Sequence, residues 1–292
     1  MQLALYCCYE LSYQGFPDVE DDWECEPSLV QVRGSLEAAF EEQLRDEVTD
    51  PRTGDLDVAG RLWEMTRGGG VSLSGWALEQ GTYGQAQEWA IHRSGYQLKE
   101  ADPHTWCLPR LTGRAKAAMV TIQADEYGNG VASEMHCTLF AQSMRALGLD
   151  DTYGAYLDLL PAETLATTNL ISLFGLHRRL RGALVGHLGL FEMTSVGPMG
   201  RYSAWLRSLG VSEAGRRFYD VHVEADEIHQ YLAVDDLVGG LLDAEPDQAA
   251  AVLFGANALG LVEGRFSARL IDCWSQQRSS LRSPQLTDTL AR

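Results

Sequence analysis

Long stretches without proline, in which apolar residues recur every three or four positions, dominate this chain. Nine prolines divide it, at positions 17, 27, 51, 103, 109, 161, 198, 246 and 284. Between them, the spacing of a helix that buries one face is seen at Leu157, Leu160, Leu165, Leu170, Ile171 and Phe174. No run of four to eight residues alternates strictly between apolar and polar, as a half-buried strand would. The sequence therefore predicts an all-α protein.

The same spacing gives approximate bounds for the helices. We expect them at residues 28–48, 55–67, 82–101, 112–126, 132–148, 162–194, 212–240 and 247–279. Ser212 and Pro161 each stand before a suitable helix start. Residues 1–26 are expected to form an irregular arm, and residues 279–292 a mobile polar tail.

A length of 292 residues with 45% hydrophobic content suffices for one large domain or two small ones. No internal repeat divides the chain. We predict an N-terminal arm and first helix over residues 1–50 that wrap the bundle, one main domain over residues 51–278, and a flexible tail over residues 279–292.

The charge and the cysteines restrict the function classes. A formal net charge of −18 argues against nucleic acid or an anionic membrane as partner, because such surfaces attract Lys and Arg. No segment approaches the roughly 20 apolar residues of a spanning helix. Six cysteines without a C-x-x-C pair indicate reduced thiols in a cytoplasmic protein.

The stretch from residue 222 to 229 carries three metal-ligand side chains: His222, Asp226 and His229. At about 100° per residue on an α-helix, these positions lie within roughly 60° of one another on one face. Phe218, Tyr219, Val221, Val223, Ile228 and residues 231–234 are expected to supply the apolar mass of a packed helix. Two imidazoles and a carboxylate that converge in this way suit a divalent first-row metal.

A second candidate ligand lies in an apolar helix. Glu192 follows Leu190 and Phe191, so a solvent-facing position is unfavourable. The same helix carries Gly182, Gly186 and Gly189, each of which costs roughly 1 kcal/mol relative to Ala in a helix interior. The glycines therefore predict a close backbone approach to another helix or to a ligand.

Three further candidates lie upstream, around a break in the chain. Glu100 ends one expected helix, Glu126 ends the next, and His136 opens another. In one unbroken helix Glu126 and His136 would be about 15 Å apart along the axis, too far to share an ion pair. Gly128 and Gly130 supply a break that can bring one back toward the other.

Together these residues resemble the seven-ligand signature of the haem-oxygenase-like diiron oxidases and oxygenases. The resemblance covers about residues 85–275 and keeps the family's order of ligands: Glu100, Glu126, His136, Glu192, His222, Asp226 and His229. The contexts of residues 97–103 and 125–128 resemble actinobacterial proteins called iron-containing redox enzymes. The resemblance implies a haem-oxygenase-like bundle whose three core helices carry the ligands of two iron ions. It assigns no role to the first eighty residues.

The resemblance also implies an activity, that of a non-haem diiron oxidoreductase with O₂ as co-substrate. Four carboxylates neutralise two Fe²⁺ ions, and three neutral imidazoles add donors without charge. An amino-acid-like substrate in specialised metabolism is favoured, with N-oxygenation, C–C cleavage or desaturation as the reaction. Oxidative decarboxylation of a fatty-acid-type substrate is the alternative. Because the chain has no flavin or ferredoxin motif, reactions that need extra electrons require an external donor.

Other interpretations stay open at this point. A non-catalytic haem-oxygenase-like binding protein, holding haem, a pyrimidine or a protein partner, is the alternative from another class. We expect a homodimer. For single residues, the alternatives are a solvated polar face for the helix of His222, an ion pair of Glu192 with Arg178 or Arg181, a simple helix end for Glu100, and Asp125 in place of Glu126.

Several other polar residues are not assigned to the site. We expect surface or capping positions for His92, His104, His177 and His187. Cys137 is interpreted as a small buried residue at a helix interface instead of a nucleophile. The acidic runs 18–22 and 41–47 are interpreted as solvated faces.

Overall fold

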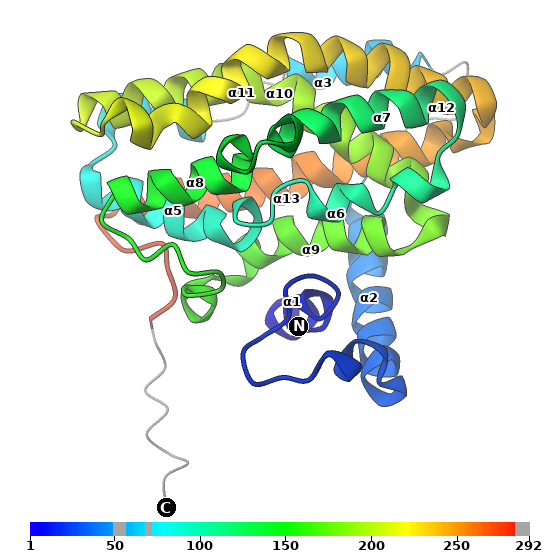
Figure 1. The fold of residues 1–292 in the computed structure, drawn as a ribbon, viewed down its shortest axis with the longest axis horizontal. Helices are drawn as coiled ribbons and strands as arrows, with labels where there is room; N and C mark the ends of the chain where they lie inside the picture. The colour runs from blue at the N-terminus through cyan, green and yellow to red at the C-terminus, as the bar shows by residue number, and fades with distance from the viewer. Residues whose placement is uncertain (49–56, 68–71, 284–292) are drawn as a thin grey trace, which may run out of the picture.

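The computed structural model describes residues 1–48, 57–67 and 72–283 (Figure 1). Within these ranges the regular elements are helices, and the predicted all-α class is confirmed. The long helices of the bundle are α5 (Tyr83–Gln97), α7 (Gly113–Glu126), α8 (His136–Ala146), α9 (Ala162–Leu176), α10 (Arg181–Ser208), α11 (Glu213–Tyr231) and α13 (Ala249–Ser275). Shorter helices are α1 (Gln2–Glu10), α3 (Val58–Thr66), α4 (Leu73–Gln80), α6 (Asp102–Thr105) and α12 (Gly239–Ala244), and α2 (Pro27–Glu47) crosses the direction of the bundle in Figure 1.

Several helices begin where the sequence predicts, and capping residues stabilise some of these starts. The Ser212 hydroxyl accepts a hydrogen bond from the Gly215 amide and caps α11. Thr82 and Gln85 form a reciprocal capping box at the start of α5. The start predicted after Pro161 is also confirmed, since α9 begins at Ala162.

Helix α10 is the centre of the packing, with its most extensive contacts to α13 and α11. Gly186 lies so close to α13 that a Cβ atom there would overlap the Val252 carbonyl, and Gly255 is equally close to Ala183. A Cβ atom at Gly182 would instead meet the side chains of Gln248 and Ala251. The close backbone approach predicted from the glycines is therefore confirmed, and its partner is a helix.

The expected single helix over residues 162–194 is wrong. Helix α9 ends at Leu176, where His177 has an extended backbone, and α10 begins at Arg181 and continues to Ser208. Pro198, which the sequence indicates as a helix boundary, lies inside α10. A proline in a helix interior costs about 3 kcal/mol, and packing of α10 against α11 and α13 outweighs this local preference.

The prediction of an irregular arm over residues 1–26 is also wrong in part. Residues 2–10 form α1, which packs on α9, and the Asn169 side-chain amide donates to the Gln2 carbonyl at 2.9 Å. Glu10 and Lys99, each about 1% exposed, form a buried ion pair at 2.5 Å. Because these partners lie far along the chain, no local pattern reveals them. Helix α4 is a further element that the sequence pattern does not predict.

Two predicted solvent-exposed segments are partly buried. Ser280, expected in a mobile tail, is fully buried and its hydroxyl bonds Glu88 and His92. Residues 284–292 of that tail lie outside the described residues. Glu41, expected on a solvated acidic face, is buried and pairs with Arg179.

The expected helix over residues 212–240 divides into α11, a π-helical segment (Leu232–Val238) and α12. By length and hydropathy, the segment Pro246–Ser275 would be long enough to cross a membrane, although no spanning segment is expected from the sequence. Half of that apolar window is buried in the protein, and core helices pass the same test, so this is weak support for a membrane span.

Candidate metal centre

Five separate segments bring the seven predicted ligands into one buried region. Glu100 lies in the turn after α5, Glu126 ends α7, His136 begins α8, and Glu192 lies in α10. The other three lie on the inner face of α11. All seven are buried, with exposed fractions from 1% to 8%: Glu100, Glu126, His136, Glu192, His222, Asp226 and His229.

The turn between α7 and α8 determines how Glu126 and His136 meet. Gly128 has a φ of +61°, and a Cβ atom there would lie 2.6 Å from the backbone nitrogen of Met135. The positive φ and the lack of space both require glycine. The chain folds back, and His136 Nδ1 lies 2.8 Å from Glu126 Oε2. The predicted fold-back is confirmed.

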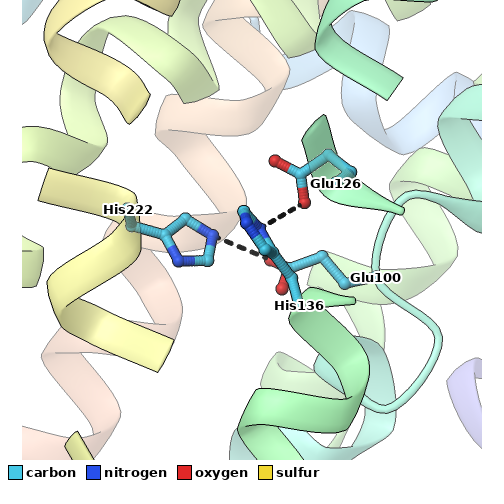
Figure 2. Close-up of side chains that lie close together, drawn as sticks. All are labelled: Glu100, Glu126, His136 and His222. Atoms are coloured by element: carbon cyan, nitrogen blue, oxygen red, sulfur yellow. Dashed lines mark ion pairs between the residues drawn. The ribbon is translucent and has the colours of Figure 1, made fainter. Parts of the chain in front are cut away.

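One group of donors contains Glu100, Glu126, His136 and His222, whose ligand atoms lie within 4.8 Å of one another. Figure 2 shows the two imidazole rings next to each other with the carboxylates of Glu100 and Glu126 close by. His222 Nε2 is 3.7 Å from Glu100 Oε1, and the ring centroids of His136 and His222 are 4.3 Å apart. Two carboxylates and two imidazoles at this spacing form a suitable site for one divalent metal ion.

A second group adjoins the first and shares Glu126 with it. Ligand atoms of Glu126, Glu192 and His229 also lie within 4.8 Å of one another. His229 Nδ1 lies 3.4 Å from Glu192 Oε2 and 3.7 Å from Asp226 Oδ1, so Asp226 borders this group. The arrangement is therefore two neighbouring donor sets with a common carboxylate between them.

Outer partners orient the histidines of α11. His222 Nδ1 donates to the Phe218 carbonyl at 2.7 Å, which leaves the lone pair of Nε2 directed toward Glu100. His229 Nε2 lies 2.8 Å from Asp125 Oδ2, which leaves Nδ1 for the site. A carbonyl or carboxylate behind a histidine is the usual arrangement at metal-binding imidazoles. Sequence reasoning weighed Asp125 only as a substitute for Glu126 and missed this role.

Several buried donor atoms at the centre lack hydrogen bonds. Glu100 Oε2, Asp226 Oδ1 and His229 Nδ1 form none with any of the residues that the structure describes. Unsatisfied buried polar atoms are costly and need a partner. Metal cations would satisfy them, and the donor set fits such ions in type and charge.

The carboxylates and imidazoles affect one another's protonation. Burial raises the pKa of Glu100 and of Glu192. Burial, with Glu192 nearby, raises the pKa of Asp226 to about 7. Burial would lower the pKa of His229, but the negative charge of the Glu192 carboxylate, 3.4 Å from Nδ1, outweighs this and raises the pKa to about 9. The metal-free site therefore holds protons that a metal ion must displace.

These shifts predict that the metal-free protein loses stability as the pH rises. Asp226 and His229 both have pKa values above those of the unfolded chain, 3.8 and 6.5. Their contribution is complete below those values and is lost as the pH passes about 7 and then about 9. We expect the melting temperature of the metal-free protein to be lower at pH 9 than at pH 6, and this decrease to be weaker in metal-loaded protein. Calorimetry at both pH values tests this, and a melting temperature that rises with pH without metal would contradict it.

The space between the donors is small. Five of the predicted ligands line the cavity, together with Tyr96, Ala101, His104, Gln123, Leu188, Phe191 and Ser195. The cavity has a volume of about 10 Å³. That is room for about one water-sized sphere. It suits ions with one small ligand, and it is too small for an organic molecule.

The burial pattern of α11 differs from the prediction. Ile228 and Tyr231, expected to pack inside, are 70% and 56% exposed. The helix buries its polar stripe and presents these apolar residues to solvent. Phe218 and Tyr219 are buried as expected. The interpretation that the stripe of His222, Asp226 and His229 faces solvent is thereby excluded.

The prediction of surface or capping positions is wrong for three of the other histidines. His92, His104 and His187 are each about 1% exposed. His104 Nε2 and His187 Nδ1 lie 3.2 Å apart, and burial lowers the pKa of His104 to about 4. None of the three belongs to the two donor groups. His177 is partly exposed, with Nε2 3.0 Å from Glu37 Oε1.

The packing also decides the surroundings of Glu192 and Cys137. Glu192 does not pair with Arg181, which instead pairs with Glu245. Glu192 lies beside His229. Cys137 is half-buried at the start of α8.

An all-helical bundle that encloses four carboxylates and three imidazoles is typical of proteins that bind first-row transition metals between helices. Residues 87–263 match the family described as iron-containing redox enzymes, and the chain belongs to that family. This is the family that the motif resemblance predicted, and its members are oxidoreductases with a haem-oxygenase-like fold.

A curated relative is the nitrosourea synthase of Streptomyces achromogenes subsp. streptozoticus. It is 25% identical to this chain over 162 residues, which is 56% of this chain and 34% of the relative. The chain thus spans about a third of the length of that relative.

Proposed function

We propose that the protein is an O₂-dependent non-haem diiron oxidase or oxygenase that acts on a small molecule. One observation carries the proposal: the two neighbouring groups of donors share Glu126. A carboxylate between two metal sites is suited to bridge two ions, and the family and the nitrosourea synthase relative favour iron and oxidative chemistry.

In this proposal one iron would be held by Glu100, His136 and His222, and the other by Glu192, Asp226 and His229. Glu126 belongs to both donor groups. Bound iron would supply electrons that reduce O₂, and this reduction drives the oxidation of the substrate. The chain's own residues fix the geometry. Ser195 donates a hydrogen bond of 2.5 Å to Asp226, and Leu188 and Phe191 limit access of water to the site.

The alternative from another class, a haem-oxygenase-like binding protein, has less support. Haem needs an axial ligand, such as a histidine, and room for a large macrocycle. The histidines of the centre are surrounded by carboxylates, and the cavity of about 10 Å³ is far too small for a macrocycle. Cytoplasmic location, a homodimer and an external electron donor remain predictions, as does the predicted division of the chain into three segments.

The test is anaerobic addition of Fe²⁺ to metal-free protein, with removal of free metal and colorimetric determination of iron. We expect about two ions per chain, because the donor set divides into two groups. Exposure to O₂ should then consume O₂ and change the visible absorption. A binding limit of one ion or none, or no reaction with O₂, would contradict the proposal.

A further inference from the structure

A second and much larger cavity lies directly beside the metal centre. Its volume is about 350 Å³, within the usual range for small-molecule sites. Helices α5, α10 and α13 form most of its wall, with the start of α4 on one side. We call this cavity the substrate chamber. It shares two residues with the metal cavity, Phe191 and Ser195.

The shared residues connect the chamber to the metal ligands. Ser195 is the residue whose hydroxyl bonds Asp226. Phe191 stacks on His187 with ring centroids 5.8 Å apart and meets Tyr96 edge-on at 6.1 Å. A molecule in the chamber would therefore contact the side chains that border the metal cavity, without having to enter it.

One wall of the chamber carries a positive and a negative group. Two nitrogens of Arg93 donate to the two carboxylate oxygens of Glu263, both at 2.8 Å. The guanidinium also lies over the ring of Trp89, 4.6 Å from its centroid. Both charged side chains are partly exposed, 15% and 24%. Because both line the chamber, each can make additional hydrogen bonds to a bound molecule.

One turn closer to the metal ligands on α5 stands Gln97, which also lines the chamber. Only 3% of this residue is exposed, and its Oε1 accepts no hydrogen bond from any residue in the described part of the chain. A buried amide oxygen without a donor is unfavourable. The unpaired amide therefore indicates a binding position for a polar group of a ligand.

We propose that the chamber binds the substrate as a zwitterion of the α-amino-acid type, an inference that rests on the proposed function. Arg93 meets the carboxylate, while Glu263 and the Gln97 oxygen accept hydrogen bonds from the ammonium group. The apolar surface of Leu190 and Met199 contacts the aliphatic part. Arg93 and Glu100 are seven residues apart on nearly helical backbone, which places them about 10 Å apart along the helix axis. A ligand side chain of several carbon atoms would therefore extend from Arg93 to Phe191 and Ser195, the two residues that border both the chamber and the metal cavity.

Three probes that share the same unbranched alkyl chain test the class of ligand. They are L-norleucine, hexanoate, which lacks the amine, and pentylamine, which lacks the carboxylate. Binding to iron-loaded protein is measured by anaerobic titration calorimetry. We expect L-norleucine to bind at least about tenfold more tightly than either analogue, since each lost charged hydrogen bond weakens binding by about that factor. Equal or tighter binding of hexanoate would overturn the proposal in favour of an acyl chain, and no binding of any probe would also overturn it.

A matched pair of glycines on α13 tests the location. A Cβ atom at Gly260, which lines the chamber, or at Gly264, which faces solvent, meets nothing within 4 Å. Gly260→Phe should abolish the binding of L-norleucine by filling the chamber, whereas Gly264→Phe should preserve it. Unchanged binding in Gly260→Phe would place the ligand elsewhere and refute the inference.

A variant of the unpaired amide tests the contact itself. Gln97→Leu should weaken L-norleucine binding about tenfold, with Gln87→Leu on the same helix as the control outside the chamber. Unchanged affinity in a folded Gln97→Leu protein would contradict the assigned contact. Iron content measured on each sample separates the two proposals. Low iron in the unsubstituted protein refutes the diiron function, while full iron without preference for L-norleucine refutes only the substrate class.

Discussion

Replacement of His222 by alanine is expected to leave the protein with at most about one bound iron per chain instead of two. Its imidazole is 4% exposed and is held by the Phe218 carbonyl so that Nε2 faces Glu100. Loss of an outer partner typically costs 10- to 100-fold in metal affinity, and loss of a ligand costs more. Anaerobic iron titration with colorimetric detection measures the effect.

His92→Ala is a suitable control for this variant. His92 is as buried as His222, and its ring nitrogens lie 2.7 Å from the Thr164 hydroxyl and 2.9 Å from the Ser280 hydroxyl. It lies outside both donor groups. We therefore expect His92→Ala to lower the melting temperature but to keep the full iron content. Full iron content in folded His222→Ala protein would remove this histidine from the centre.

Replacement of Gly186 by alanine is expected to destabilise the protein by about 3 kcal/mol or more, because overlap with backbone cannot be relieved by a side-chain rotation. A Cβ atom there would overlap the Val252 carbonyl of α13. The helices must separate, and α10 carries Glu192. The melting temperature should fall by roughly 6–10 °C. Thermal and urea unfolding measure the change.

Gly264→Ala is the control, since it makes the same substitution on the exposed side of α13 in open space. Alanine is the better helix former by roughly 0.5–1 kcal/mol, so this variant should be equally stable or slightly more stable. Equal melting temperatures for the two variants would show that the contact between α10 and α13 is adaptable.

The stripe on α11 shows what local spacing can predict. Positions 222, 226 and 229 share a helix face whatever the rest of the chain does, so their common burial followed from the sequence. The break at Gly128 was predictable for a similar reason, because glycine is favoured where φ is positive. That Ile228 and Tyr231 face solvent was not predictable, since local periodicity does not say which face meets a partner.

Partners distant in sequence account for most of what was missed. Asp125 meets His229 across 104 residues, and Gln2 meets Asn169 across 167. Neither pair has a spacing that a sequence pattern could reveal. Pro198 gave a wrong helix boundary for a different reason. Proline disfavours a helix interior locally, but the contacts of α10 with α11 and α13 outweigh this preference.

The sequence by itself determined the helical class, the order of the seven candidate ligands and membership of an iron-containing family, because these depend on residue type and short-range spacing. Only the tertiary structure decided that the ligands divide into two groups around Glu126, and that a chamber with Arg93, Glu263 and Gln97 adjoins them. Which side chains become neighbours depends on how closely the helices pack against one another. Here that distance is set by backbone contacts such as Gly186 against Val252, which form only when the whole bundle has assembled.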